Sequence, residues 1–190
     1  LAGLENYLVP DPVAQIKAGR AAPLNGSRYF LVELPLSQIP HFTEEALFQL
    51  QAGGYVPILA HPERCQAFHQ DQQLLVRLVQ RGILVQVTGG SLLGHFGAQA
   101  RAFARDALQR RLVHFLATDM HSPRTVRRPA LQAAVAETTR LVGAERARRL
   151  VEGNPRSVLD NEEIEIEPPL ANGRSRWLWW GGWSWGGSYE

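Results

Sequence analysis

Short apolar runs recur along the chain about one β/α unit apart, and each run ends in polar residues. The runs cover residues 29–34, 56–60, 83–88 and 113–118. Between them, apolar residues at helical spacing predict helices at 13–18, 44–52, 72–81, 98–111, 130–142 and 144–152. Thr43 and Asp71 are predicted to cap the helices that follow them. The alternation of strands and helices predicts an α/β fold with a parallel sheet or barrel.

Polar side chains with the chemistry of a metal site follow these predicted strands. They are Glu33, then His61, Glu63 and Arg64 where the run 56–60 breaks at Pro62, and then Asp119 and His121. Asp119 and His121 are two residues apart in an extended segment, so they can face the same way. Catalytic groups of α/β proteins lie at the carboxyl ends of strands. Imidazole with carboxylate suits Mn, Zn or Fe, and an arginine fork suits a phosphoryl group, so the pattern predicts metal chemistry on a phosphate.

Composition narrows the function classes. A chain of 190 residues suits one domain with a sizeable core, and no apolar run approaches the length of a membrane span. The net charge is only +2, and Lys17 is the sole lysine. The arginine-rich stretches show no regular interleaving of aromatic residues, so we interpret them as solvated helix faces and predict no nucleic-acid partner.

The single cysteine, Cys65, raises the alternative of a cysteine-dependent phosphatase with a Cys-x5-Arg loop. The residue at the arginine position is Asp71, whose carboxylate would repel phosphate, and the intervening residues include no glycine. We therefore interpret Cys65 as a small buried side chain. His95 follows a predicted strand end in a loop and is a further candidate to line the site.

Four segments, taken in order, resemble the polymerase-and-histidinol-phosphatase (PHP) superfamily. They are Leu-Val-Glu-Leu-Pro, Ile-Leu-Ala-His-Pro-Glu-Arg, Ser-Leu-Leu-Gly-His-Phe-Gly and Ala-Thr-Asp-Met-His-Ser. More narrowly, the chain resembles the bacterial manganese-dependent protein-tyrosine phosphatases of capsule and exopolysaccharide operons. The resemblance covers roughly residues 3 to 160.

The resemblance implies a distorted β/α barrel of the TIM-like PHP type and a specific set of site residues. Glu33, His61, Asp119 and His121 would be metal ligands, and Glu5 would bridge metals. The cofactor would be two or three Mn²⁺ ions, with other divalent metals as alternatives. Arg64 and Arg128 would hold the phosphate, with Arg124 and Arg127 as competitors for the second role.

The implied activity is metal-dependent hydrolysis of phosphotyrosine on protein in the cytoplasm. The implied substrate is the tyrosine-rich tail of a bacterial tyrosine kinase that controls polysaccharide export. Two alternatives stay open: another PHP phosphoesterase, acting on histidinol phosphate or a nucleic-acid end, and an inactive remnant that binds phosphotyrosine through Arg64 or binds nothing. The oligomeric state is not indicated.

The family begins with a His-x-His strand, and this sequence has no His-x-His anywhere. We therefore expect the phosphatase domain, residues 1–160, to be incomplete at its amino end. Residues 161–190 are expected to form an acidic linker and a disordered tail rich in Trp and Gly.

Overall fold

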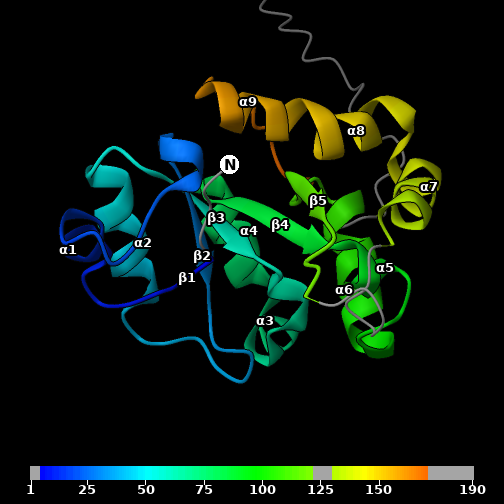
Figure 1. Ribbon diagram of the computed structural model, residues 1–190. Helices are drawn as coiled ribbons and strands as arrows, with labels where there is room; N and C mark the ends of the chain where they lie inside the picture. Colours follow the sequence, from blue (N-terminus) through cyan, green and yellow to red (C-terminus); the bar gives the residue numbers. More distant parts are fainter. Residues whose placement is uncertain (1–4, 122–129, 171–190) are drawn as a thin grey trace, which may run out of the picture.

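The computed structural model describes residues 5–121 and 130–170. Within them, five parallel strands form one sheet in the order β1-β2-β3-β4-β5, so strands that follow each other in sequence are neighbours in space (Figure 1). The strands are β1 Asn6–Tyr7, β2 Tyr29–Glu33, β3 Val56–Ala60, β4 Leu84–Thr88 and β5 Phe115–Ala117. The predicted α/β class with a parallel sheet is confirmed. In the part of the chain described, β1 and β5 do not pair with each other, so this sheet is open and the expected barrel is not closed.

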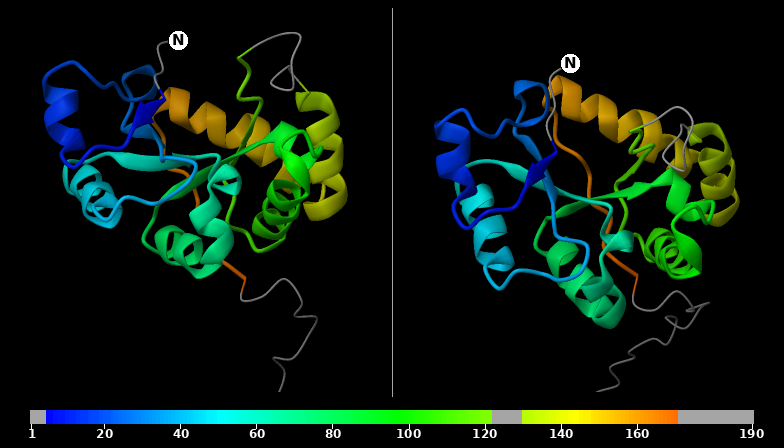
Figure 2. Two further views of the ribbon diagram at one scale, coloured as in Figure 1. Left: turned by 90° about the horizontal axis from the view of Figure 1, so that it is seen from below. Right: turned by 60° about the horizontal axis from the view of Figure 1, so that its bottom comes forward.

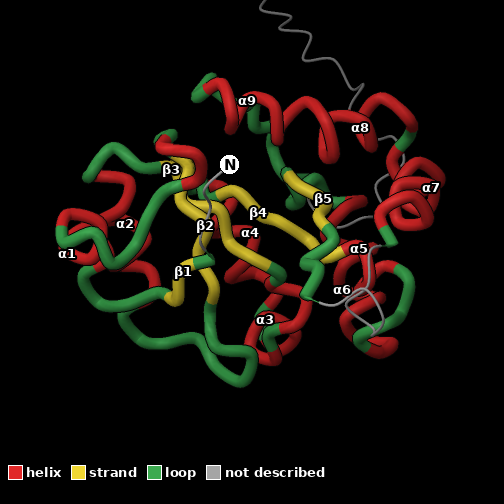
Figure 3. Tube along the Cα trace, viewed as in Figure 1, coloured by secondary structure: helices red, strands yellow, loops and turns green. Residues whose placement is uncertain are grey.

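Helices connect and cover the strands (Figure 3). They are α1 Pro12–Lys17, η1 Leu24–Gly26, α2 Thr43–Ala52, η2 Pro62–Arg64, α3 Gln66–Gln70, α4 Gln72–Gln80, α5 Gly89–Leu92, α6 Gly97–Gln109, α7 Leu131–Val142, α8 Ala144–Arg148, η3 Arg149–Gly153 and α9 Asn154–Asp160. The six predicted helices are all present within a few residues of their predicted bounds. The sequence did not predict α3, α5 or α9. The helices α3 and α5 contain five and four residues, which is too short to show a helical period.

The two predicted helix caps have different outcomes. The Asp71 side chain accepts a hydrogen bond from the Leu74 N–H at 3.2 Å, which confirms it as the cap of α4. The prediction for Thr43 is wrong. Thr43 is the first residue of α2, and the cap position belongs to Phe42, whose carbonyl accepts the Ala46 N–H at 2.9 Å. The Thr43 side chain is buried, and this helix has no side-chain hydrogen bond at its cap.

Apolar side chains cover both faces of the sheet, which explains why the strands read as nearly continuous apolar runs. Neighbouring residues point to opposite faces: Leu59 and Val85 pack among α2, α4 and α6, whereas Ile58 and Leu84 face Val158 and Ile164. The views of Figure 2 show α9 and the chain after it on this second side of the sheet. No helix among the residues with a described position is long and apolar enough to cross a membrane.

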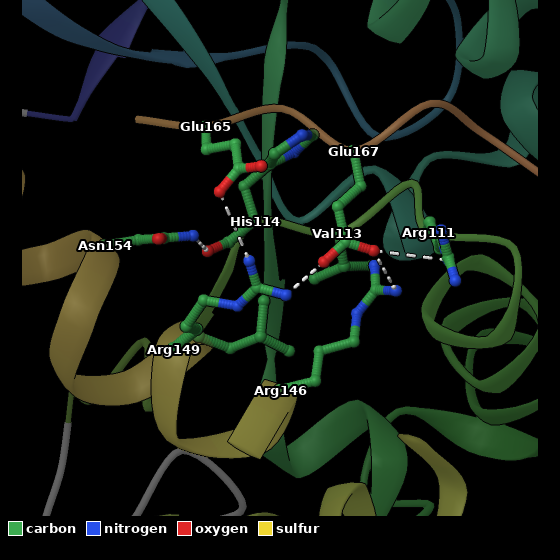
Figure 4. A pocket seen from close by; sticks show the side chains of 9 residues that line it. Arg111, Val113, His114, Arg146, Arg149, Asn154, Glu165 and Glu167 are labelled. Carbon is green, nitrogen blue, oxygen red and sulfur yellow. Dashed lines mark hydrogen bonds and ion pairs between the residues drawn. The ribbon is translucent and has the colours of Figure 1, made fainter. Parts of the chain in front are cut away.

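Residues 161–170 contact the domain at several points. Ile164 is buried in the second core, and the Leu170 N–H donates to the Arg110 carbonyl at 2.9 Å. Figure 4 shows the carboxylate of Glu167 among arginine side chains, and Arg111 and Arg146 each lie 3.3 Å from it. The predicted domain boundary after residue 160 stays a prediction, and residues 171–190 lie outside the described residues.

Candidate metal centre and phosphate site

The parallel register brings the carboxyl ends of β2 to β5 to one edge of the sheet. Val32 is paired with Leu59, Ala60 with Gln86, and Thr88 with Ala117. The His61 N–H extends the ladder by one hydrogen bond, to the Gln86 carbonyl at 2.8 Å. The predicted ligands follow directly after these pairs.

Two of the predicted ligands have backbone angles in the left-handed region. His61 has a φ of 35° directly after β3, and Asp119 has a φ of 47° two residues after β5. A non-glycine residue rarely adopts this conformation, and where it does, the strain is often held at functional sites. In both cases the chain turns sharply at the ligand residue itself, so its side chain stays at the carboxyl ends of the strands.

The first cluster joins Glu5, Glu33 and His61, with one ligand atom from each within 4.8 Å of the others. The His61 Nε2 lies 2.9 Å from the Glu5 Oε1 and 3.5 Å from the Glu33 Oε1. The pKa of His61 is lowered, first by burial of the ring, which is 1% exposed, and then by the positive charge of Arg64. A neutral imidazole keeps a nitrogen lone pair, which metal ligation needs.

The second cluster joins Glu5, Asp119 and His121 within the same 4.8 Å limit. The Nδ1 of His121 lies 3.4 Å from the Asp119 Oδ1 and 3.1 Å from the Asp119 carbonyl oxygen. The His121 side chain is 51% exposed, so this cluster opens to solvent. Glu5 belongs to both clusters, and this is the position that the resemblance assigned to a bridging carboxylate.

Arg64 lies at the edge of the second cluster. Its Nη1 donates to the Asp119 Oδ2 at 2.6 Å, and its Cζ lies 4.7 Å from the centre of the Phe96 ring. The residue comes from η2, the short turn that also follows His61. The structure therefore brings together every predicted site residue that it describes: Glu5, Glu33, His61, Arg64, Asp119 and His121. Arg128 and its competitors Arg124 and Arg127 lie outside the described residues.

The sequence assigned no role to Glu63, which is fully buried between His61 and Arg64. Its Oε1 accepts hydrogen bonds from the Thr88 N–H at 2.9 Å and the Ser91 hydroxyl at 2.7 Å. Burial raises the pKa of Glu63 to about 7, against the lowering effect of these bonds. The sequence carries no signal for this burial, because Glu63 stands among the polar residues of a turn after Pro62.

The remaining candidates do not join the clusters. The Cys65 thiol is buried beside the Pro35 carbonyl at 3.3 Å, and burial raises its pKa. A raised pKa disfavours the thiolate that a cysteine nucleophile requires, which agrees with the interpretation from sequence. His95 lies beside Phe96, with its Nδ1 buried and without a hydrogen-bond partner among the described residues.

Comparison with known proteins gives the family. The model of the family "Capsular polysaccharide synthesis, CpsB/CapC" matches residues 1–160. The tyrosine-protein phosphatase YwqE of Bacillus subtilis is 37% identical over 146 residues, which are 77% of this chain and 57% of YwqE. The putative tyrosine-protein phosphatase CapC of Staphylococcus aureus is 34% identical over 179 residues, which are 94% of this chain and 69% of CapC.

A solved structure agrees with the sequence relatives. It is described as one of the crystal structures of YwqE from Bacillus subtilis and CpsB from Streptococcus pneumoniae, "unique metal-dependent tyrosine phosphatases". It matches with a TM-score of 0.84 and 33% identity over 89% of this chain and 68% of that chain. The chain thus spans between 57% and 69% of the length of these relatives. Because the family model matches most of the chain, the protein belongs to the CpsB/CapC family of capsular polysaccharide synthesis.

Proposed function

We propose that this protein hydrolyses phosphotyrosine on protein in a metal-dependent reaction, as a phosphoric monoester hydrolase. The observation that carries the proposal is the position of Glu5, which is shared by two potential metal-binding clusters beside an arginine. Two adjacent cation sites flanked by a guanidinium group suit an in-line displacement at phosphorus. The relatives named tyrosine-protein phosphatase support the same assignment.

The donor set fits divalent metal ions. Three carboxylates and two imidazoles converge, and burial together with the charge of Arg64 lowers the pKa of His61, which favours the neutral ring. Oxygen and imidazole donors without thiolate suit Mn²⁺, Zn²⁺ or Fe²⁺, and we propose two or three Mn²⁺ ions. Glu5, Glu33, His61, Asp119 and His121 would hold them. When bound, ions of this kind acidify water and polarise phosphoryl oxygens at neutral pH.

Arg64 is proposed to bind the phosphate. A guanidinium has five N–H donors in a fixed fork, and the bond to Asp119 uses one of them. The others suit bidentate binding of non-bridging phosphate oxygens, and the fixed positive charge offsets the negative charge that grows in the transition state. Arg128 is proposed as a second phosphate-binding residue, on the basis of its Arg-Pro motif alone.

The proposal extends to the partner and to the wider fold. A family of capsular polysaccharide synthesis supports a substrate that is a tyrosine-phosphorylated bacterial kinase controlling polysaccharide export, in the cytoplasm. The sheet, with parallel strands in sequential order and α2, α4 and α6 packed on one face, supports a PHP-type barrel as the architecture.

The test is hydrolysis of a phosphotyrosine peptide by the chain, with added Mn²⁺ and with a chelator, beside histidinol phosphate as a second substrate. We expect Mn²⁺-dependent turnover that prefers the peptide. Arg64→Ala should lower kcat/KM by a factor of about 10² to 10³, the usual loss when one group that stabilises transition-state charge is removed.

The matched control is Arg81→Ala, because Arg81 is exposed, pairs with Glu44 and precedes β4, so it lies away from the carboxyl ends of the strands. It should leave kcat/KM unchanged. Preference for histidinol phosphate would reassign the substrate. The proposed activity would be contradicted if the folded chain binds Mn²⁺ in calorimetry but hydrolyses neither substrate.

A further inference from the structure

Two groups from different elements hold the guanidinium of Arg64. The carboxylate of Asp119, after β5, accepts a hydrogen bond from the Arg64 Nη1 at 2.6 Å. The centre of the Phe96 ring, after α5, lies 4.7 Å from the Arg64 Cζ. A cation within about 6 Å of a ring centre is attracted to the face of the ring. The ion pair fixes one edge of the guanidinium, and the ring fixes its plane. Together they restrict a side chain that otherwise has many rotamers.

The backbone around Phe96 is shaped to place its ring. The loop between α5 and α6 turns through Gly94 and Gly97, whose φ angles of 86° and 92° favour glycine. The His95 N–H donates to the Gly90 carbonyl at 2.9 Å, which folds the loop back onto α5. The loop therefore returns to the same strand end that carries the site.

Gly90 gives the ring its space. A Cβ atom at Gly90 would lie 3.1 Å from the Phe96 Cε2 and 3.2 Å from the His95 Nδ1, which is tighter than ordinary packing allows. Gly90 has no positive φ, so it is needed for this close approach and not for its backbone angles. The Phe96 ring is thus seated directly on the backbone of α5.

We propose that Phe96 is a positioning residue for Arg64, which holds the guanidinium in the orientation that binds phosphate. The proposal rests on the proposed function, because it takes Arg64 as the phosphate-binding residue. Without the ring, Arg64 keeps its bond to Asp119 but can rotate out of plane, so its remaining donors are no longer fixed for a bidentate contact.

The test is a double-mutant cycle on the affinity of the Mn²⁺-loaded chain for inorganic phosphate, measured by calorimetry. Phe96→Leu should weaken phosphate binding about fivefold, in line with one lost cation–π contact. Phe96→Tyr should keep the wild-type affinity for phosphate, because it keeps an aromatic ring under the guanidinium. In an Arg64→Ala background, Phe96→Leu should have no further effect, because the residue acts only through Arg64.

Gly90→Ala is the second perturbation, because it moves the ring while leaving Phe96 in the sequence. It should weaken phosphate binding by less than Phe96→Leu does. Gly153→Ala is its control, since a Cβ there meets only Arg149 side-chain atoms at 3.6 Å or more. Circular dichroism and thermal melting would establish that each variant is folded.

The outcomes separate this proposal from the proposed function. An equal effect of Phe96→Leu with and without Arg64, or a folded Phe96→Leu or Gly90→Ala with wild-type phosphate affinity, overturns the role of Phe96. Wild-type protein that binds no phosphate overturns it as well. Intact coupling between the two residues in a chain without phosphotyrosine turnover supports the role of Phe96 and contradicts only the proposed substrate.

Discussion

At the scale of single residues, the carboxyl group of Glu63 connects the ends of β3 and β4. It accepts the Thr88 N–H and the Ser91 hydroxyl while fully buried, and the Glu63 carbonyl accepts a hydrogen bond from the His69 ring at 2.7 Å. His61 and Arg64 lie on either side of it in the chain. The turn that carries a proposed metal ligand and a proposed phosphate ligand is thus fixed through its middle residue.

We expect Glu63→Ala to lower the free energy of unfolding by about 2–5 kcal/mol, because it leaves two buried donors without an acceptor. Glu63→Gln keeps an oxygen at one position and should lose less, about 1 kcal/mol. Urea unfolding followed by far-UV circular dichroism measures both variants. Glu145→Ala, on the exposed first turn of α8, is the control. If Glu63→Ala were as stable as this control, the connecting role of Glu63 would be wrong.

The site residues that could be predicted from the sequence are those attached directly to strand ends. Glu33, His61 and Asp119 follow apolar runs, and the carboxyl ends of parallel strands meet at one edge. The partners of Glu63 and Phe96 could not be predicted in this way. Their contacts depend on how side chains leave short turns, and neither a turn nor a single aromatic residue shows a period in the sequence.

At the scale of elements, residues 161–170 are held against α8 and η3 by charge. Glu167 is 24% exposed and pairs with Arg146, Arg149 and Arg111 (Figure 4). Glu165, two residues earlier, is 85% exposed and lies 3.9 Å from Arg149. The sequence predicted an acidic linker here because glutamates dominate residues 161–170. Ile164 is the one buried residue among them, and a single apolar position does not form an alternating apolar and polar pattern that would indicate packing on the domain.

Glu167→Gln should lower the free energy of unfolding by about 1–2 kcal/mol, because three partly buried guanidinium groups then have only the exposed Glu165 as a counter-charge. Glu165→Gln should change it by less than about 0.5 kcal/mol, as an exposed substitution does. Thermal melts at low and high salt would compare the two. Equal melting temperatures for both variants would mean that the segment is held by Ile164 and the backbone alone.

At the scale of the whole molecule, the order of strands and helices could be predicted because each apolar run is buried on both faces of the sheet. The two-residue strand β1 could not, since so short a strand is defined only by its pairing with Val32 and Glu33 of β2. Closure of a sheet is likewise a long-range property. It depends on which strands meet at the edges, and local pattern carries no information about that.

Stability of the whole domain should depend on pH through His114, which lies between β4 and the α8–η3 region. Its Nδ1 accepts the Val85 N–H at 3.1 Å, which requires an unprotonated nitrogen. Burial first, and then the charge of Arg146, lowers the pKa of His114 to about 4, while Glu167 acts in the opposite direction. Arg111, Arg149 and Glu165 line the same small cavity.

The sign of the effect follows from the proton count. Between about pH 6.5 and pH 4 the unfolded chain binds a proton at His114 that the folded chain does not, so acidification favours unfolding. The folded state should lose about 3 kcal/mol from this group across that range and nothing above it. Urea midpoints at pH 7.5, 6.5, 5.5 and 4.5 measure the slope.

His114→Asn separates this contribution from that of the carboxylates. An amide oxygen can accept the Val85 N–H but does not titrate, so the variant should be less stable than the wild type at pH 7.5 and should lose less stability on acidification. The difference between the two slopes isolates His114. Parallel slopes would mean that His114 becomes protonated in the folded state and that the contact with Val85 opens, which would contradict the lowered pKa.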